Sequence, residues 1–202
     1  SVWLERLKDV ETEPQDLILA MRGLGSVREL SALENLLSIA SDRLRNSAIR
    51  IEAATAAGNM AETGLEQRAD RLALDPRASL FVNQICAVRL LAHHSSESAR
   101  KTLTELAGHE EPAVVATALQ RLNGIDFSLV LPLAESAIQS SDPQVRRQGA
   151  ISILQLQSAD HIASLSRLLA DPNPDLRRLV CDGLHQLASH AELNELVLNA
   201  AM

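Results

Sequence analysis

The stretch DPNPDLRRLVCDGLHQLA, Asp171–Ala188, decides the expected fold, because a similar stretch, DPQVRRQGAISILQLQ, Asp142–Gln157, begins 29 residues earlier. Each begins with Asp-Pro and continues through an aliphatic residue and Arg-Arg into a run with many apolar residues. Proline suits the first turn of a helix because its missing N–H has no hydrogen-bond partner there. An acidic residue before it caps the free N–H groups and opposes the positive end of the helix. The repetition therefore predicts two equivalent helices that begin at equivalent turns.

Turns of this kind recur along the whole chain. Glu13-Pro14, Asp75-Pro76 and Glu111-Pro112 have the same acid–proline pair, and Ser41–Arg45 has the place of a further turn without proline. The turns stand at positions 14, 43, 76, 112, 143 and 172, with gaps of 29, 33, 36, 31 and 29 residues. Gaps of this length are typical of helical solenoids, in which each repeat is a pair of helices.

Apolar spacing predicts one helix after each turn and another before it. From Leu176 to Leu187 the apolar residues recur at three- and four-residue intervals, which places them on one face of a helix. Breakers such as Gly58-Asn59 and Asn123-Gly124 separate the pairs. The first helices of the pairs are expected at 3–9, 27–40, 60–74, 98–107, 132–139 and 162–170.

These observations predict an all-α fold, a right-handed α-solenoid of about six helix pairs with an unpaired C-terminal helix. We expect a single domain over residues 1–202, with a further repeat starting at 191–202. The chain begins with Ser1 rather than Met and its last helix lacks a partner, so we expect it to be a piece of a longer protein. The pairs are expected at about 1–24, 25–58, 59–94, 95–124, 125–157 and 158–190.

The composition favours helices and limits the function. Apolar residues make up 46% of the chain and aromatic residues 1%, so the apolar mass is Leu and Ala rather than the aromatic residues that strands favour. The net charge of −7 argues against nucleic acid as a partner. No apolar run approaches the length of a membrane span. Two distant cysteines, Cys86 and Cys181, cannot form a disulfide framework. They indicate either a reducing compartment, from which we expect a cytoplasmic protein, or simply two small core residues.

The Asp-Pro turns, followed by Arg-Arg and a helix rich in Ala and Leu, resemble HEAT repeats, above all the short bacterial kind similar to phycobilin-lyase repeats. In that family the turn aspartate and the arginine at the start of the second helix form a ladder between neighbouring repeats. Two middle repeats depart from the pattern, with Phe81 and Val115 in the place of the arginine. The resemblance assigns the ladder to Asp42 with Arg45, Asp142 with Arg146, and Asp171 with Arg177.

No group of residues predicts catalysis, a metal site or a cofactor. His93 and His94 are adjacent, so on a helix their side chains diverge and do not converge on one metal ion. Cys86 has no partner in the sequence that marks it as a nucleophile. Gly23 and Gly25 are typical of the end of a helix rather than of a phosphate-binding loop. We therefore expect a protein that is not an enzyme.

The second helices of the pairs carry 11 of the 19 basic residues, whereas the first helices carry most of the acids. In a HEAT-like stack the second helices line the concave face, and solenoids use such faces for binding. We therefore expect a scaffold that uses this face to bind an acidic segment of another protein or of another domain of its own chain, or another anionic partner. The residues expected on this face are Asn46, Arg50, Arg89, Gln120, Asn123, Arg147, Arg178 and His185.

Two other functions stay open. The resemblance implies a phycobilin-lyase-like subunit or chaperone that acts on a bilin–protein conjugate, but a tetrapyrrole pocket needs convergent aromatic and polar groups. A HEAT-like DNA glycosylase needs a basic groove with aromatic side chains that hold a base. The only aromatic residues are Trp3, Phe81 and Phe127, which counts against both alternatives.

Overall fold

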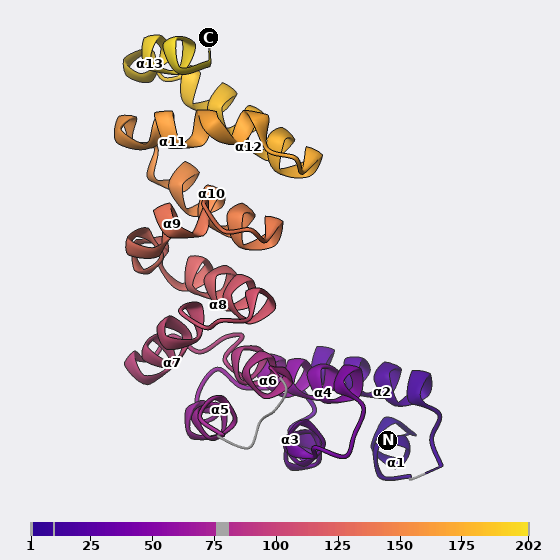
Figure 1. Ribbon diagram of the computed structural model, residues 1–202. Helices are drawn as coiled ribbons and strands as arrows, with labels where there is room; N and C mark the ends of the chain where they lie inside the picture. Colours follow the sequence, from indigo (N-terminus) through magenta and orange to yellow (C-terminus); the bar gives the residue numbers. More distant parts are fainter. Residues whose placement is uncertain (1, 10, 76–80, 202) are drawn as a thin grey trace. The chain divides into compact units, whose positions relative to one another are not determined.

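The computed structural model describes residues 2–9, 11–75 and 81–201, and every regular element within them is helical (Figure 1). Contacts divide the chain into two compact units, Ser1–Arg121 and Leu122–Met202. Helix pairs follow one another along the described chain and α13 comes last, so the prediction of an all-α solenoid of six pairs and a final helix is confirmed.

The elements alternate between first and second helices of a pair. The first unit contains α1 (Val2–Lys8), α2 (Pro14–Ser26), η1 (Leu30–Ala32), α3 (Leu33–Ser41), α4 (Ser47–Met60), α5 (Glu66–Ala73), α6 (Val82–Leu90), α7 (Glu97–Ala107) and most of α8 (Pro112–Ile125). The second unit contains the end of α8, then η2 (Phe127–Leu129), α9 (Leu131–Ala137), α10 (Pro143–Leu156), η3 (Ala159–His161), α11 (Ile162–Arg167), η4 (Leu168–Ala170), α12 (Pro174–Ala188) and α13 (Ala191–Ala201).

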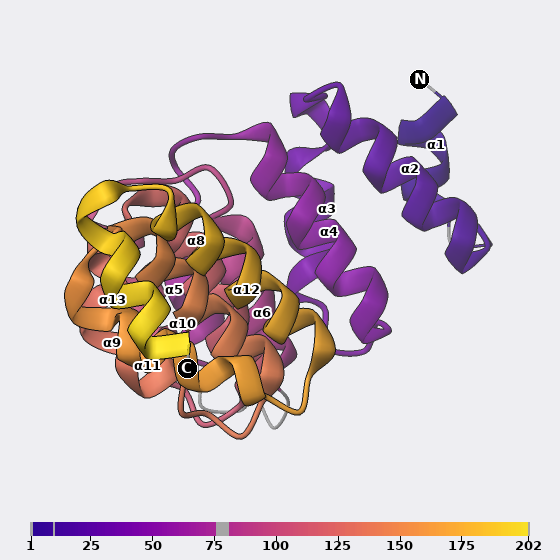
Figure 2. The same ribbon diagram turned by 90° about the horizontal axis from the view of Figure 1, so that it is seen from above.

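In the first unit the second helices α2, α4 and α6 lie side by side, and Figure 2 shows α1 next to α2. Small residues allow this close packing. Ala53, Ala56, Ala57 and Gly58 of α4 are all buried. A Cβ atom on Gly58 would lie 2.1 Å from the carbonyl oxygen of Arg89, so only glycine fits where α4 meets α6.

The core of the second unit is aliphatic. The apolar positions that the sequence places on one helix face, among them Leu176, Val180 and Leu184, are buried in it. Full burial of one such side chain contributes about 1.5–3 kcal/mol, so the stacking of these helices is the main source of stability. The core cluster comprises Ala134, Ile138, Ala150, Ile153, Ile162, Leu165, Leu168, Leu176, Val180, Leu184, Leu187 and Val197.

Three acid–proline turns begin a helix as predicted. Helix α2 begins at Pro14, α8 at Pro112 and α10 at Pro143. Proline therefore has the N-terminal position that its missing N–H favours. The predicted start at Pro76 lies outside the described residues.

Two predicted helix starts are wrong. Helix α12 begins at Pro174 rather than Pro172, because the Asn173 side chain accepts hydrogen bonds from two backbone N–H groups of the first turn and caps the helix there. Helix α4 begins at Ser47 rather than near position 43, because Asn46 is its N-cap residue. In both repeats an asparagine, and not the aspartate earlier in the turn, decides where the helix begins.

Two first helices are shorter than predicted. The helix expected at 60–74 begins at Glu66, because Met60 still belongs to α4 and Gly64 turns the backbone with a φ of +89°. The helix expected at 27–40 is divided into η1 and α3 after a turn in which Arg28 has a φ of 51°. Backbone turns with positive φ therefore separate these helices from the preceding second helix.

The two cysteines lie in different environments. Both are free thiols; Cys86 is buried in α6 and Cys181 is exposed on α12. Burial raises the pKa of the Cys86 thiol to about 11, and the positive charge of Arg50 opposes this with a smaller effect. None of the described helices is long and apolar enough to cross a membrane.

Substitution of Gly58 by alanine tests the close packing of α4 and α6. Alanine favours helix by about 1 kcal/mol over glycine, yet the new methyl group overlaps the Arg89 carbonyl oxygen. We expect Gly58→Ala to destabilise the first unit by about 1–3 kcal/mol in urea unfolding. Gly108→Ala, where the nearest atom to the new Cβ is 3.5 Å away, is the matched control and should change stability little.

The thiols should differ in reactivity. Because only the thiolate reacts, we expect a thiol reagent at about pH 8 to modify Cys181 rapidly and Cys86 only after unfolding. Counting the modified thiols by absorbance, with and without denaturant, checks this. Cys181→Ser should remove the rapid reaction, and rapid reaction of a second thiol in the native protein would contradict the burial of Cys86.

Candidate partner-binding face

The middle second helices contain arginines but no acidic residues. Helices α6, α8 and α10 together carry Arg89, Arg121, Arg146 and Arg147 and contain no Asp or Glu. Each of the first helices α3, α5, α7 and α9, by contrast, contains at least one Glu. We use the term second-helix face for the exposed and half-exposed side chains of the second helices, taken in each unit by itself.

Two of the predicted residues of this face, Arg89 and Gln120, line one pocket of about 210 Å³ in the first unit. Arg89 comes from the last turn of α6 and Gln120 from α8. Among the described residues Arg89 makes no ion pair, and its Nε atom is buried without a hydrogen-bond partner. The complete lining is Val88, Arg89, Ala92, Thr117, Gln120 and Arg121.

Arg121 is held at the same pocket by backbone groups. Its Nε donates to the carbonyl oxygen of Leu91 at 2.8 Å and its Nη2 to that of His94 at 2.9 Å. These carbonyls follow the C-terminal end of α6, where a helix favours positive charge. Burial lowers the pKa of Arg121, but an arginine stays protonated in proteins. The pocket therefore holds two cationic side chains, and no acidic residue is among its lining residues.

Arg50, predicted on the partner face, lies inside the structure instead, with 4% of its surface exposed. Its Nε donates to the carbonyl oxygen of Ala40 at 3.0 Å, and its Nη2 donates to Oδ1 of Asn83. Asn83 in turn donates to Asp75 at 3.4 Å. Because α4 begins at Ser47, Arg50 is the fourth residue of its helix, as Arg146 is in α10. Arg50 therefore connects neighbouring repeats and is not available to a partner.

Asn123 is also used within the structure. Its Nδ2 donates to the carbonyl oxygen of Gln148 at 3.4 Å, and its Oδ1 accepts from the Ser152 hydroxyl at 2.7 Å. It therefore connects α8 to α10, which corrects its predicted place on the partner face. Asn46 is exposed but caps α4 by accepting from the backbone N of Ala48 at 2.8 Å.

The remaining predicted residues of the face lie on α10 and α12. Arg147 is half-exposed and has no ion pair among those of the described residues. Arg178 is exposed and stands 4.0 Å from Asp182, one turn along the same helix. An exposed pair at this distance contributes little. His185 is exposed on α12 as well. Arg147 and Arg178 thus keep their charge available at the surface of the second unit.

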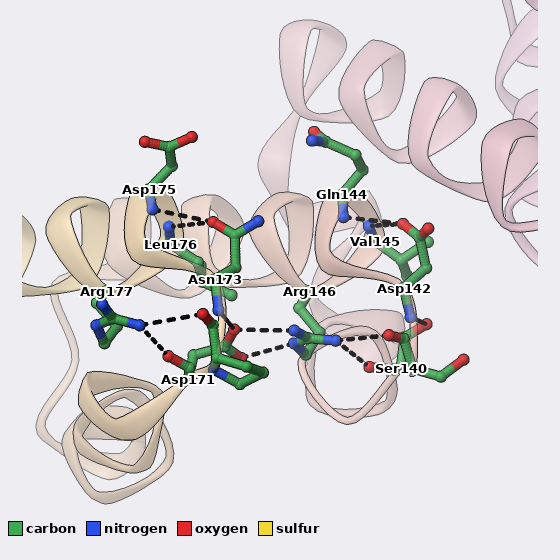
Figure 3. A network of polar contacts seen from close by, with 12 residues as sticks. Ser140, Asp142, Gln144, Val145, Arg146, Asp171, Asn173, Asp175, Leu176 and Arg177 are labelled. Atoms are coloured by element: carbon green, nitrogen blue, oxygen red, sulfur yellow. Dashed lines mark hydrogen bonds and ion pairs between the residues drawn. The ribbon is translucent and has the colours of Figure 1, made fainter.

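The ladder that the sequence predicts between repeats is made by Arg146 and Asp171 (Figure 3). Arg146 Nε and Nη2 donate to the two carboxylate oxygens of Asp171 at 2.7 and 2.8 Å, and its Nη1 donates to the carbonyl oxygens of Ser140 and Ser141. The hydrogen bonds from Arg146 lower the pKa of Asp171. The fork of one arginine therefore joins the turn of its own repeat to the turn of the next.

The other ladder assignments differ from the prediction. Arg177 donates through Nη1 to the carbonyl oxygens of Asp171 and Pro172, rather than to a carboxylate (Figure 3). Asp142 caps its own helix by accepting from the backbone N of Gln144 and Val145, as Asn173 does in α12. Asp142 and Asp171 therefore do not occupy equivalent positions, although both stand before a proline.

Asp42 and Arg45 do form the predicted pair, at 3.6 Å, but Arg45 is exposed and both lie within one turn, so the pair does not connect neighbouring repeats. In the second unit Ser140 has the place that Asp171 has in the next repeat, because its hydroxyl accepts from the backbone N–H two residues later. The preceding second helix has Val115 as its fourth residue. Thus Val115 stands in the place of the arginine, and Ser140 stands in the place of the aspartate.

A second pocket, of about 170 Å³, lies between α10 and α12. Leu154, Leu179 and Leu187 make its walls apolar, and Asp182 adds a negative charge. Its acidic residue makes it unlike the pocket at Arg89. Among the described residues no group of three or more His, Cys, Asp or Glu side chains is placed to hold a metal ion.

A family model and one solved structure agree with the helix-pair architecture. A family model of HEAT repeats matches residues 130–200. A chain from the complex of CpcE and CpcF of phycocyanin lyase from Nostoc sp. PCC7120 has a similar structure, with a TM-score of 0.58 and 18% identity over 96% of this chain and 78% of that chain. A designed armadillo repeat protein in complex with the peptide (KR)4 has a TM-score of 0.49 and 16% identity, over 100% of this chain and 98% of that chain. No curated protein sequence matches.

Removal of one ladder partner should destabilise the second unit. Arg146→Val leaves the buried Asp171 carboxylate without its main donor, and we expect a loss of about 3 kcal/mol in the free energy of unfolding. The double variant Arg146→Val/Asp171→Ser reproduces the combination of Val115 and Ser140. Its free energy of unfolding should fall by less than that of Arg146→Val. Urea unfolding of both variants, compared with the wild-type chain, measures the difference.

The same pair should give the second unit a characteristic acid sensitivity. Because the pKa of Asp171 is lowered in the folded state, its stabilising effect is present above the ordinary aspartate pKa of about 3.9 and is lost as the pH falls below it. Asp171→Asn should lose less stability than the wild-type chain over this acidic range. Equal losses would contradict the pairing.

Proposed function

We propose that this HEAT-repeat chain is a non-catalytic scaffold that binds an acidic segment of another protein, or of another domain of its own chain, along the second-helix face. The observation that carries the proposal is the presence of arginines, without any Asp or Glu, on α6, α8 and α10. The solenoid fold itself is typical of proteins that bind partners over an extended surface. One chain of similar structure comes from a complex of two proteins, which is compatible with this use of the fold.

The ion pairs of the first unit support a special role for the middle second helices. Arg28 pairs with Glu62 at 3.2 Å and Arg68 with Glu34 at 3.3 Å, so these exposed arginines are neutralised within the chain. Arg89 and Arg147 have no such partner among the ion pairs of the described residues. With a Debye length of about 8 Å at physiological salt, a local positive surface can attract an acidic segment although the whole chain has a net charge of −7.

A bilin-binding function has less support. The pocket at Arg89 has a volume of about 210 Å³, below the range of about 300–1,000 Å³ that is usual for ligand sites. Val88 and Ala92 are its apolar lining residues, and no aromatic side chain lines it. The pocket is therefore suited to a side chain rather than to a tetrapyrrole.

Charge reversal on the second-helix face tests the proposal. We expect a fluorescein-labelled peptide of alternating Glu and Ala to bind the chain, with affinity that falls as salt rises. Arg89→Glu/Arg147→Glu should weaken binding by at least about tenfold, because a like charge replaces each attraction. Fluorescence anisotropy at low and moderate salt measures both effects.

The matched control reverses Arg100 and Arg167, two exposed arginines of first helices. Arg100→Glu/Arg167→Glu changes the net charge by the same amount and should leave the affinity within about twofold. Equal weakening by both double variants, or equal binding of a Lys-Ala peptide, would show that the chain lacks an acidic-segment site on the second helices.

A further inference from the structure

We propose that the pocket formed by the end of α6 and by α8 binds the side-chain carboxylate of a Glu or Asp in the partner protein, with Arg89 as its main donor. This inference rests on the proposed function and assigns one anchor site within it. The residues that form the site are Val88, Arg89, Ala92, Thr117, Gln120 and Arg121.

The hydrogen-bonding state of Arg89 is the first argument. Its Nε atom is buried and has no acceptor, although buried polar groups in folded proteins nearly always have one. No hydrogen bond or ion pair of the Arg89 side chain occurs among the described residues. An unsatisfied buried donor costs about 1–3 kcal/mol, and more for a charged group. A carboxylate is the acceptor that matches the planar guanidinium, with two parallel hydrogen bonds.

The local charge is the second argument. Arg121 places a second guanidinium at the pocket, and its Nε and Nη2 are fixed by the carbonyl oxygens of Leu91 and His94. A carbonyl oxygen satisfies a donor but does not neutralise the charge. Two cations near one pocket without an acidic lining residue repel each other, and a bound carboxylate would relieve this repulsion.

The lining decides which part of a partner fits. Val88 and Ala92 offer apolar contacts to the methylene groups of an acidic side chain, and the exposed amide of Gln120 can donate a further hydrogen bond. The Thr117 hydroxyl already donates to the carbonyl oxygen of Ala113 at 2.7 Å, so it can only accept from a ligand. A pocket of about 210 Å³ has room for one acidic side chain, and the rest of the partner's affinity has to come from other contacts.

The test uses one labelled peptide with a single Glu between Ala residues and a Gln version of the same peptide. We expect the Glu peptide to bind at least about tenfold more tightly than the Gln peptide. Two variants of the pocket should remove this difference. Arg89→Lys keeps the charge but loses the planar fork, and Ala92→Leu narrows the pocket without changing any charge.

Matched controls separate the pocket from general charge and size effects. Arg100→Lys makes the same replacement on an exposed first helix, and Ala113→Leu adds the same side chain at an exposed position of α8. Both should bind the Glu peptide as the wild-type chain does. Thermal unfolding monitored by circular dichroism verifies that each variant is folded. In addition, the ¹⁵N signal of the Arg89 Nε–H, assigned with Arg89→Lys, should shift when the Glu peptide is added.

The outcomes separate this inference from the proposed function. Salt-sensitive binding of the glutamate-rich peptide, with no effect of Arg89→Lys or Ala92→Leu and no shift of the Arg89 signal, would overturn the anchor site and leave the proposed function standing. No binding of the glutamate-rich peptide would overturn both. Binding of free propionate as tightly as the Glu peptide would identify a small-carboxylate site and overturn the assignment to a partner side chain.

Discussion

Successive second helices of the first unit approach so closely that a methyl group on Gly58 would lie 2.1 Å from the carbonyl oxygen of Arg89. This approach is required because a helix pair cannot bury its apolar face alone and has to stack on its neighbours. In the second unit Gly183 packs against the side chain of Leu154 in a similar way. The carbonyl groups at the ends of these helices and in the turns that follow have no partner within the helix and need other donors.

Arginines provide these donors. Arg50, Arg121 and Arg146 each donate to backbone carbonyl oxygens of a turn or helix end, and Arg146 also binds the next repeat through Asp171. The guanidinium group suits this role because it has five donors in one plane and keeps its charge when partly buried. Arginines that hold the repeats together in this way are not free to bind a partner. A partner can be bound only by the other arginines of the second helices.

Arg89 and Arg147 differ from this group, because neither has an ion pair among those of the described residues. They lie on helices that have no acidic residue, in a chain whose net charge is −7. Acidic residues elsewhere give the chain its negative net charge, whereas the charged residues of α6, α8 and α10 are all basic. Such a local contrast gives specificity and faster association more than it gives affinity. The proposed scaffold function follows from this contrast, together with a fold that offers an extended surface.

The sequence by itself determined that the chain forms helix pairs, because the apolar period and the acid–proline turns are local features. It did not determine the role of each arginine. Arg50 was predicted on the partner face, yet it is buried between repeats, since Asn46 starts α4 later than the turn at Asp42 indicates. Successive side chains of a helix differ by about 100° around its axis, so an alignment of repeats that is wrong by a few residues assigns a side chain to the wrong face. Only the tertiary structure decided which arginines face a neighbouring repeat and which face solvent, because that depends on helix register and on the turns packed beside it.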